Sequence, residues 1–238
     1  MEELIEERRG RVLVATFNRP DRLNAFTGEQ YGRLGALLSR AREDDEISVV
    51  LVTGTGRAFS SGDDLSLYED PALAEEANEA FNAMLESLLS FDKPLVAAVN
   101  GLAIGFGATL LLHFDVVLAS TEARLRYPFS EMGVPPEAAS SVLLPSCVGP
   151  QRAAELLFGA DWIDAERACE LGLFARVLPP DELVPAALDL ATHFSERPLA
   201  GLQIAKRLLL HDRREAVEGA HARETAAVET LLPAASKS

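Results

Sequence analysis

The chain has 238 residues, and its 37 aspartate and glutamate residues outnumber its 22 lysine and arginine residues, which gives a formal net charge of −15. Hydrophobic residues make up 48% of the sequence, which excludes a disordered chain and predicts one large domain, with or without a small appendage. The acidic balance argues against nucleic acid as a partner and against docking on an anionic membrane. On charge alone, no polyanionic ligand is expected.

The chain has two cysteines, Cys147 and Cys169, without the spacing of a metal site or a disulfide framework, so we expect a reducing compartment. The charged N-terminal sequence MEELIEERRGR predicts no signal peptide, and the C-terminal AASKS is not a peroxisomal address. These features favour a cytoplasmic protein.

One stretch, residues 94–114, has 21 residues without Asp, Glu, Lys or Arg, and this length could span a bilayer. However, Asn100-Gly101 is a turn signal in its middle. We therefore interpret the stretch as a buried strand, then a turn and a helix of small residues, and expect no membrane-spanning segment.

The first predicted elements are a strand at Arg11–Phe17, a turn, and a helix that begins after Thr27. Gln30 follows Thr27 at the spacing of a capping box, in which the hydroxyl of the first residue accepts a backbone N–H of the first turn. The helix places its apolar residues on one face; these are Tyr31, Leu34, Leu37 and Leu38.

Strands and helices then alternate, which predicts an α/β layered core. A long helix is expected at about 72–90. The runs of β-branched and apolar residues that predict strands are Ile47–Gly54, Leu95–Val99, Val116–Ser120, Ala123–Tyr127 and Phe174–Pro179.

From about Pro198 onward, the chain is predicted to be purely helical. A helical segment without its own strand must bury its apolar face on the core or on another subunit. The domain organisation that follows is a core at residues 1–196 and a C-terminal helical region at residues 197–238.

Several common sites are absent from the sequence. There is no G-x-S-x-G elbow and no Walker sequence, and the glycines of residues 101–107 lack the order of a dinucleotide fingerprint. None of the four histidines has the spacing of a metal ligand, so no metal site is predicted; these are His113, His193, His211 and His221.

Two glycine-containing turns remain as candidates. In RAFSSGDDL (residues 57–65), Gly62 allows a sharp turn that points neighbouring N–H groups into one concavity, although an ordinary strand-to-helix loop would also explain it. In NGLAIGFGATLLL (residues 100–112), an apolar helix begins at Phe106 and exposes unpaired N–H groups, although close packing through small residues is an equal explanation. Two such donors aimed at one point would form an oxyanion hole.

A third candidate is Glu137, in YPFSEMGVPPEAASSVLLP. An acidic residue in the first turn of a helix is ordinarily stabilised by the helix dipole. The alternative is a carboxylate in apolar surroundings, where burial would raise its pKa towards the range of a general base.

Taken together, the segments RPDRLNAF, RAFSSGDDL, NGLAIGFGATLLLHFDVVLAS, YPFSEMGVPPE and GADWIDAERACELGLFARVLP resemble the crotonase (enoyl-CoA hydratase/isomerase) superfamily in order and spacing. The resemblance covers residues 12–210. It implies an α/β fold: a crotonase-like spiral of repeated ββα units with a C-terminal helical trimerisation region. It also implies an acyl-CoA thioester ligand, whose thioester oxygen would accept the backbone N–H groups of Asp63 and Phe106.

The hydratases of this superfamily use two glutamates, and their positions are occupied here by Thr109 and Phe129. The Δ3,Δ2-enoyl-CoA isomerase branch instead has one glutamate in a sequence resembling YPF-x-x-x-G-x-x-x-E-G. YPFSEMGVPPE matches it up to Glu137, and Ala138-Ala139 replaces the glycine. The resemblance therefore implies an isomerase in which Glu137 moves a proton from C2 to C4 of a 3-enoyl-CoA.

An apolar wall that excludes water is expected from Phe129, Met132, Val134 and Leu143. No cofactor is expected, because CoA is part of the substrate. The resemblance implies a homotrimer or a dimer of trimers. It places substrate and CoA contacts at Arg22, Leu23, Asn24, Ala25, Arg57, Ser61, Gly62, Asp64, Leu65, Gly105, Phe129 and Met132. Further candidate partners for the CoA phosphates are Lys206, Arg207, Arg213 and Arg214.

Two other functions stay open at this point. One is another crotonase-type enzyme, such as a hydratase that uses an unusual second carboxylate, for which Glu131 is the nearby candidate. The other is an acyl-CoA-binding scaffold without turnover, against which the presence of Glu137 speaks.

Overall fold

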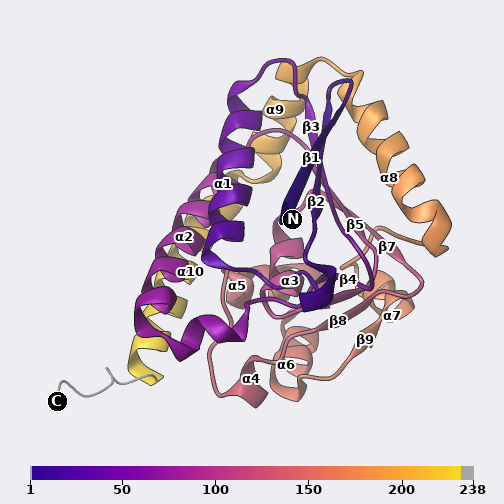
Figure 1. Cartoon of the computed structure of the whole chain (residues 1–238). Coiled ribbons are helices and arrows are strands. Elements are labelled where there is room, and N and C mark those ends of the chain that lie inside the picture. The colour runs from indigo at the N-terminus through magenta and orange to yellow at the C-terminus, as the bar shows by residue number, and fades with distance from the viewer. Residues whose placement is uncertain (1, 232–238) are drawn as a thin grey trace.

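The computed structural model describes residues 2–231, and its core is a six-stranded sheet in the order β1-β2-β3-β5-β7-β10 (Figure 1). The edge pair β1–β2 is antiparallel, and the remaining neighbours are parallel. The six strands are β1 (Leu4–Arg9), β2 (Val12–Phe17), β3 (Val49–Gly54), β5 (Leu95–Val99), β7 (Val116–Ser120) and β10 (Arg176–Leu178).

A second sheet has four short strands in the order β4-β6-β8-β9. β4, β6 and β8 are parallel, and β9 pairs antiparallel with β8. The four strands are β4 (Ala58–Ser60), β6 (Leu102–Ile104), β8 (Arg124–Arg126) and β9 (Ile163–Asp164).

The two sheets are built from the same repeated unit. In the pairs β3/β4, β5/β6 and β7/β8, the first strand joins the large sheet, the second joins the small sheet, and a helix follows. This arrangement confirms the α/β fold of repeated ββα units that the sequence predicted.

Helices cover both faces of the large sheet. α1, α2 and α10 lie side by side along one flank, and α8 covers the opposite face, where it packs on apolar side chains of β2, β3, β5 and β7 (Figure 1). A parallel sheet that is buried on both faces has continuous apolar strands, which explains why these strands could be predicted from the sequence. The helices are α1 (Gly28–Glu43), α2 (Pro71–Ser90), α3 (Phe106–Thr109), α4 (Phe129–Met132), α5 (Ser140–Val148), α6 (Pro150–Gly159), α7 (Ala165–Glu170), α8 (Pro180–Ser195), α9 (Leu199–Leu209) and α10 (His211–Leu231), with 3-10 turns η1 (Pro20–Arg22), η2 (Leu65–Glu69) and η3 (Leu110–His113).

The N-terminal helix has the predicted start and the predicted buried face. The Thr27 side chain accepts the N–H of Gln30 at 3.2 Å, and the four apolar residues expected on one face are buried. Gly35 of α1 lies so close to α2 that an added Cβ would be 3.0 Å from the Cα of Met84. The absence of a side chain at Gly35 lets the two helices pack this closely.

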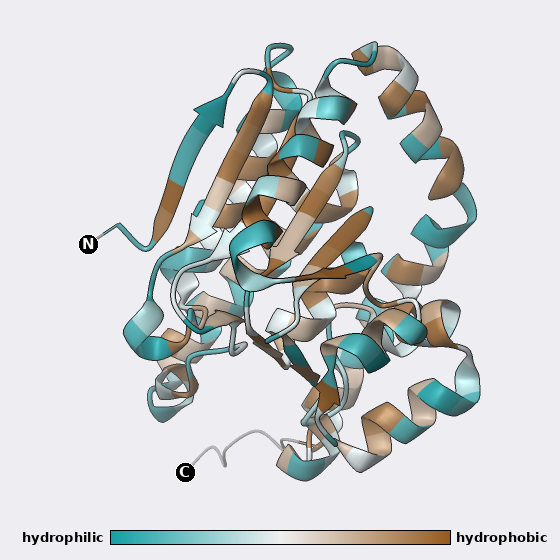
Figure 2. Cartoon of the chain, turned by 90° about the vertical axis from the view of Figure 1, so that its right-hand side faces the viewer, coloured by the Kyte–Doolittle hydropathy of each residue, from teal (hydrophilic) through white to brown (hydrophobic). Residues whose placement is uncertain are grey.

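β1 is a strand that the sequence did not predict. Its sequence, LIEERR, is buried only at Leu4, because it lies at the sheet edge and its remaining side chains face solvent. In Figure 2 the edge strand beside the N-terminus is hydrophilic over most of its length, whereas the strands inside the sheet are hydrophobic. Charged edge strands protect a sheet from pairing with other chains, at the cost of an apolar sequence signal.

The uncharged stretch 94–114 lies inside the fold. It forms β5, the short strand β6, α3 and η3, so the predicted turn leads into a second strand before the helix begins. In the described part of the chain, no helix is both long and apolar enough to cross a membrane.

The C-terminal segment is helical, as predicted, and consists of α9 and α10. α10 packs against α5 and contacts α2 through a hydrogen bond of 3.0 Å between His221 Nε2 and Asn82 Oδ1. By contrast, α9 exposes Ile204, Leu208 and Leu209. The division into a core at 1–196 and a helical region at 197–238 stays a prediction.

Candidate active site

The two glycine-containing turns lie against each other. Gly62 has φ +84°, and a Cβ added there would lie 2.8 Å from the carbonyl oxygen of Ile104 and 3.2 Å from the amide nitrogen of Phe106. Both the positive φ and the close approach require glycine. The residues that follow Gly62 and Gly105 are therefore neighbours in space, although they are more than 40 positions apart.

The first turn is held by the segment 22–26. Backbone hydrogen bonds run from Ser61 N–H to Leu23 C=O (3.0 Å), from Phe26 N–H to Gly62 C=O (2.8 Å) and from Asp64 N–H to Phe26 C=O (2.8 Å).

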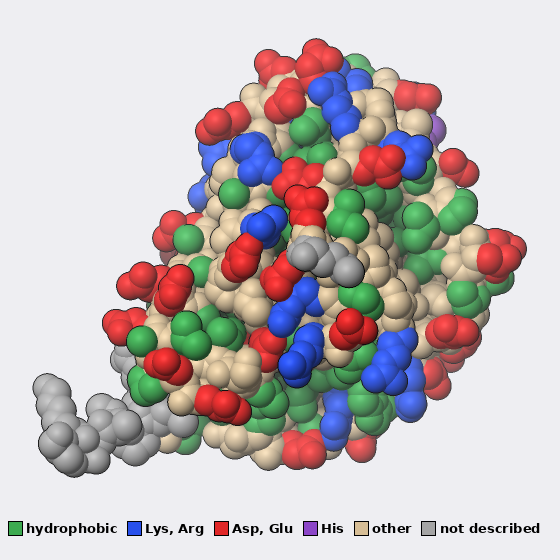
Figure 3. Space-filling view, in the orientation of Figure 1, with side chains coloured by type: hydrophobic (Ala, Val, Ile, Leu, Met, Phe, Trp, Pro, Cys, Tyr) green, Lys and Arg blue, Asp and Glu red, His purple; other side chains and the backbone are tan. Residues whose placement is uncertain are grey.

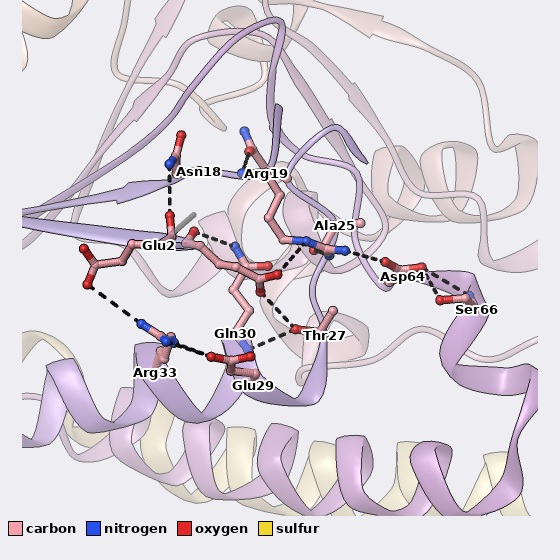
Figure 4. A network of polar contacts seen from close by, with 12 residues as sticks. Glu2, Asn18, Arg19, Ala25, Thr27, Glu29, Gln30, Arg33, Asp64 and Ser66 are labelled. Atoms are coloured by element: carbon pink, nitrogen blue, oxygen red, sulfur yellow. Dashed lines mark hydrogen bonds and ion pairs between the residues drawn. The ribbon is translucent and has the colours of Figure 1, made fainter. Parts of the chain in front are cut away.

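Arg19 ties the same two segments together from the side (Figure 4). Its guanidinium donates to the carbonyl oxygen of Ala25 and forms ion pairs with Glu3 and with Asp64, at 3.1 and 2.9 Å. Side-chain and backbone bonds thus both join residues 22–26 to residues 61–64. They fix the position of the segment 22–25, where CoA contacts are predicted.

Two backbone donors remain at this junction. Within residues 2–231, the N–H of Asp63 makes no hydrogen bond. The N–H of Phe106 is at the first position of α3, where no intrahelical acceptor exists, and it makes no other bond in the same residues. Both N–H groups are thus free to donate to a ligand, as the predicted oxyanion hole requires.

A cavity of about 270 Å³ lies beside these donors and contains Glu137. Three segments far apart in the sequence form it: the region from Tyr31 to Phe81, the loop before α5, and α10. Its lining residues are Tyr31, Asp63, Leu67, Tyr68, Ala74, Ala77, Asn78, Phe81, Pro136, Glu137, His221, Glu224, Thr225 and Val228.

Glu137 is half-buried in the loop between α4 and α5. Burial raises the pKa of its carboxyl group well above the ordinary value, and the nearby carboxylates of Asp63 and Glu224 raise it further. A group of this kind can accept and return a proton near neutral pH.

The two alanines after Glu137 adopt a glycine-like backbone. Ala138 and Ala139 have φ of +53° and +58°. The replacement of the family's glycine is therefore accommodated by strain, which persists only where surrounding contacts hold it.

The side chain of Asp63 also lies in the cavity, which the sequence did not indicate. Its two carboxylate oxygens accept hydrogen bonds from the hydroxyls of Tyr31 and Tyr68. The sequence selected Asp63 only for its backbone N–H.

The four residues of the predicted apolar wall do not line this cavity, and their contact with the substrate stays a prediction. Of the expected four, Phe129 and Leu143 are buried in the core, Val134 packs against that core, and Met132 is 52% exposed on the one-turn helix α4, so none of them lines the cavity. The apolar wall consists instead of Leu67, Ala74, Ala77, Phe81, Pro136 and Val228.

The hydratase positions supply no carboxylate. Thr109 is fully buried and donates its hydroxyl to the carbonyl oxygen of Phe106 at 3.3 Å. Glu131, the candidate second carboxylate, is exposed, forms an ion pair with Arg126 and does not line the cavity that contains Glu137. The carboxylates that do share the cavity with Glu137 are those of Asp63 and Glu224.

The basic residues differ in their availability to a ligand. Arg22 and Arg57 are exposed beside the first turn. Lys206 is buried in an ion pair with Asp115 at 2.8 Å, and Arg213 donates to the carbonyl oxygen of Leu112 at 2.6 Å.

Lys206, Arg207, Arg213 and Arg214 line a separate cavity of about 630 Å³ that shares no lining residue with the Glu137 cavity. Lys206 and Arg213 therefore stabilise the fold through contacts within the chain and are not free to bind a phosphate. Among residues 2–231, no group of three or more His, Cys, Asp or Glu residues could hold a metal ion.

The remaining predicted contacts lie along the two turns. Asn24 and Ala25 are buried, whereas Leu23, Ser61, Asp64 and Gly105 are partly exposed and Leu65 is 61% exposed. The side-chain amide of Asn24 donates to the carbonyl oxygens of Thr55 and Ala58, at 2.9 and 2.7 Å, so it shapes the turn. Their roles in substrate binding stay predictions.

Comparisons with known proteins agree with this architecture. The family model described as Enoyl-CoA hydratase/isomerase matches residues 7–236. A crystal structure of an enoyl-CoA hydratase/isomerase from Pseudoalteromonas atlantica T6c has a TM-score of 0.93 and 36% identity, over 98% of this chain and 93% of that chain.

Characterised relatives include both isomerases and hydratases. Similar proteins of Escherichia coli (strain K12) are 1,2-epoxyphenylacetyl-CoA isomerase (35% identity, 83% of this chain and 78% of that protein) and 2,3-dehydroadipyl-CoA hydratase (36%, 94% and 88%). Enoyl-CoA delta isomerase 2 of Homo sapiens is 36% identical over 87% of this chain and 54% of that protein. The resemblance noted in the sequence is confirmed, and the chain belongs to the enoyl-CoA hydratase/isomerase family.

Proposed function

We propose that the protein is a Δ3,Δ2-enoyl-CoA isomerase that uses Glu137 as its single catalytic acid–base group. The observation that carries the proposal is the position of Glu137, half-buried in a cavity beside two free backbone donors, while Thr109 and Phe129 replace the two hydratase glutamates.

In the proposed reaction, the thioester oxygen accepts the N–H groups of Asp63 and Phe106. The Glu137 carboxylate removes a proton from C2 of a 3-enoyl-CoA, and the C2–H electron pair forms a dienolate whose negative charge rests on the thioester oxygen. Glu137 then returns the proton to C4, which leaves the double bond between C2 and C3. The two donors stabilise the charge that develops, and removal of one such donor typically costs ~10²–10³ in rate.

The reaction needs no metal and no cofactor apart from the CoA of the substrate. The CoA is expected along the segment 22–25 and the turn at residues 61–65, with Arg22 and Arg57 near its phosphates. The exposed apolar residues of α9 support assembly with other subunits, because an apolar patch on a folded surface commonly marks a protein contact. The homotrimer or dimer of trimers is what the family resemblance implies.

A second candidate is hydration of a 2-enoyl-CoA, which the presence of two carboxylates, Asp63 and Glu137, in one cavity favours. The Asp63 oxygens already accept two tyrosine hydroxyls, so this carboxylate is less suited to activate a water molecule than the free Glu137. We therefore favour the isomerase.

The test supplies purified protein with a 3-enoyl-CoA and, separately, with a 2-enoyl-CoA. We expect the absorbance of a conjugated thioester from the first substrate, and its loss in Glu137→Gln. Glu131→Gln is the matched control, because it removes an exposed carboxylate outside the cavity.

Water addition to the 2-enoyl-CoA that survives Glu137→Gln would overturn the proposal. Binding of both thioesters without any product would instead indicate a non-catalytic scaffold.

A further inference from the structure

Three carboxylates meet at the proposed active site, those of Asp63, Glu137 and Glu224. They come from the first glycine turn, the loop before α5, and α10, so the fold brings them together over a span of more than 160 residues. Carboxylates confined to one small space cannot all be ionised without strong repulsion. Their hydrogen-bond partners decide which one carries the proton.

Asp63 has two donors. The hydroxyls of Tyr31 and Tyr68 donate one to each carboxylate oxygen. Burial, together with the Asp63 charge, raises the pKa of both tyrosines, so both hydroxyls stay protonated and remain donors. Hydrogen bonds of this kind stabilise the ionised form of the aspartate.

Glu224 also has two donors, and they belong to the loop that carries Glu137. Its carboxylate accepts the backbone N–H of Ala139 at 2.7 Å and that of Ser141 at 2.9 Å, and the residue is only 6% exposed. These two N–H groups lie at the start of α5, where a negative charge interacts favourably with the helix dipole. Glu224, like Asp63, thus has one hydrogen-bond donor on each carboxylate oxygen.

The same contact keeps the Glu137 loop in its unusual shape. Two consecutive alanines with positive φ are strained, and the bond from Ala139 N–H to Glu224 is one of the contacts that hold them. The others are a 2.8 Å bond between His113 Nε2 and the carbonyl oxygen of Ala138, and a 2.9 Å bond from Ser140 N–H to Glu137 C=O.

Glu137 differs from its two neighbours. Within the part of the chain that the structure describes, its side chain has no hydrogen-bond donor at all. The other titratable groups that face the loop and the cavity make hydrogen bonds to other partners. Tyr31 and Tyr68 donate to Asp63. His221 bonds to Asn82, and His113 bonds to the carbonyl oxygen of Ala138.

We propose that Asp63 and Glu224 are positioning residues, which together hold the cluster's proton on Glu137, and that Glu224 also fixes the Glu137 loop. For its catalytic consequence, the inference rests on the proposed role of Glu137.

The consequence is a definite pH dependence. Glu137 must be ionised to accept the C2 proton, so kcat/KM rises as the pH passes through the pKa of Glu137 in the free enzyme. A neighbouring negative charge raises that pKa and moves the rise to higher pH. Removal of either neighbouring charge therefore moves the rise to lower pH.

The experiment compares Asp63→Asn and Glu224→Gln in the full-length protein. Asp63→Asn retains the backbone N–H and leaves the contacts of the Glu137 loop intact, but it removes the charge and replaces one of the two oxygens that accept tyrosine hydroxyls with an NH₂ group. Glu224→Gln removes the charge and replaces one acceptor oxygen with an NH₂ group. Glu218→Gln, an exposed glutamate of α10 paired with Arg214, is the matched control.

The first readout is the infrared C=O stretch of a protonated carboxyl group, assigned to Glu137 by its disappearance in Glu137→Gln. We expect the titration midpoint of this band to move to lower pH in Asp63→Asn and Glu224→Gln, and to stay in place in Glu218→Gln. An unchanged midpoint in both variants overturns the inference, and this readout does not depend on any catalytic activity.

The second readout is the pH profile of isomerisation. We expect the low-pH limb of kcat/KM to move to lower pH in both variants, and Glu224→Gln alone to lose kcat on the order of 10–100-fold, because a displaced base loses its reactive geometry. A band that shifts in a protein without isomerase activity would refute the proposed function but not the location of the proton. A second outcome would refute the inference but not the proposed function: Glu137→Gln abolishes the activity, while Asp63→Asn and Glu224→Gln shift neither the infrared band nor the low-pH limb of kcat/KM.

Discussion

Glu137 lies in the loop before α5, and His113 contacts the same loop at the carbonyl oxygen of Ala138. Burial moves the pKa values of these two side chains in opposite directions. Burial raises that of Glu137 well above its ordinary value, and burial lowers that of His113 to about 4. Both shifts favour the neutral form of the side chain. Asp63 and Glu224, by contrast, each accept two hydrogen bonds.

Glu137→Gln should stabilise the protein, and more so at high pH. The folded protein binds more protons than the unfolded chain between the ordinary pKa of 4.5 and the raised pKa of Glu137, so Glu137 lowers stability as the pH rises through this window. Glutamine does not titrate. Denaturant unfolding at pH 4, 6 and 8 should show a gain that grows with pH, and an equal gain at all three values would contradict the prediction.

His113 should make the protein sensitive to mild acid. Its pKa is lowered from 6.5 to about 4, so between these values the unfolded chain binds a proton that the folded protein does not. The stability contributed by neutral His113 is present above pH 6.5 and falls as the pH drops through the window, by up to about 3 kcal/mol.

His113→Gln keeps a donor for the Ala138 carbonyl and does not titrate. The unfolding free energy of this variant should therefore fall less between pH 6.5 and 4 than that of the unmodified protein. Identical slopes would mean that another group is responsible.

At the scale of single residues, the sequence allowed prediction of groups that act through their own local motif. Glu137 and the turn at Gly62 belong to such motifs. Glu224 was not predictable, because its partners, Ala139 and Ser141, are more than 80 positions away and nothing in the surrounding helix distinguishes it from other exposed-looking glutamates. The side chain of Asp63 was not predicted to lie in the site, because the resemblance implied a role only for its backbone N–H.

At the scale of elements, the site depends on how closely α3 approaches β4. A Cβ added at Gly107 would lie 2.3 Å from the carbonyl oxygen of Ser60, which is backbone and cannot move away cheaply. Phe106, the second proposed donor, immediately precedes this contact. The helix start and the small sheet are therefore coupled through one glycine.

Gly107→Ala should displace the start of α3 and lower stability by about 1–3 kcal/mol or more, as overpacking of a core does. It should also reduce isomerisation, because the Phe106 N–H moves from its position. Gly32→Ala is the control: an added Cβ there meets nothing within 4 Å, and alanine favours a helix over glycine by ~1 kcal/mol. Unfolding and activity measured on both variants test the idea, which fails if Gly107→Ala is as stable as the unmodified protein.

The elements that the sequence predicted and those that it missed differ in burial. β2, β3, β5 and β7 are buried on both faces and have unbroken apolar sequences. β1 is exposed along most of its length, and β6 has three residues between two turns. β1 is not apolar enough, and β6 is not long enough, for periodicity to reveal it. Pairing with a neighbouring strand, which a single segment cannot show, makes each of them a strand.

At the scale of the whole molecule, the net charge of −15 was a poor guide to the ligand. Acidic and basic side chains are interspersed over the face seen in Figure 3, so the field that a ligand meets is set locally. Exposed Arg22 and Arg57 beside the first turn offer positive charge where an acyl-CoA of this family is expected. Charge arithmetic argues against a broad polyanion such as nucleic acid but not against a compact one.

The exposed apolar face of α9 makes the assembly testable. Ile204 and Leu208 are one helical turn apart and are 51% and 71% exposed, so burial in a subunit contact would remove apolar surface from water. Ile204→Asp/Leu208→Asp should convert the expected trimer to monomers, measured by sedimentation equilibrium. The control, Val184→Asp on α8, introduces a charge at a residue that is 41% exposed and should leave the assembly unchanged.

The monomeric variant should also retain isomerase activity per chain. Glu137, the side chain of Asp63 and the α10 residues that line the cavity, such as Glu224, belong to the same chain, so the proposed base and its neighbours need no second subunit to meet. Subunit contacts through α9 would then stabilise the fold without completing the site. If the double variant stays trimeric, α9 is not the contact. If it becomes monomeric and folded but inactive, a second subunit contributes to the reaction. The prediction that one subunit is sufficient for activity would then be wrong.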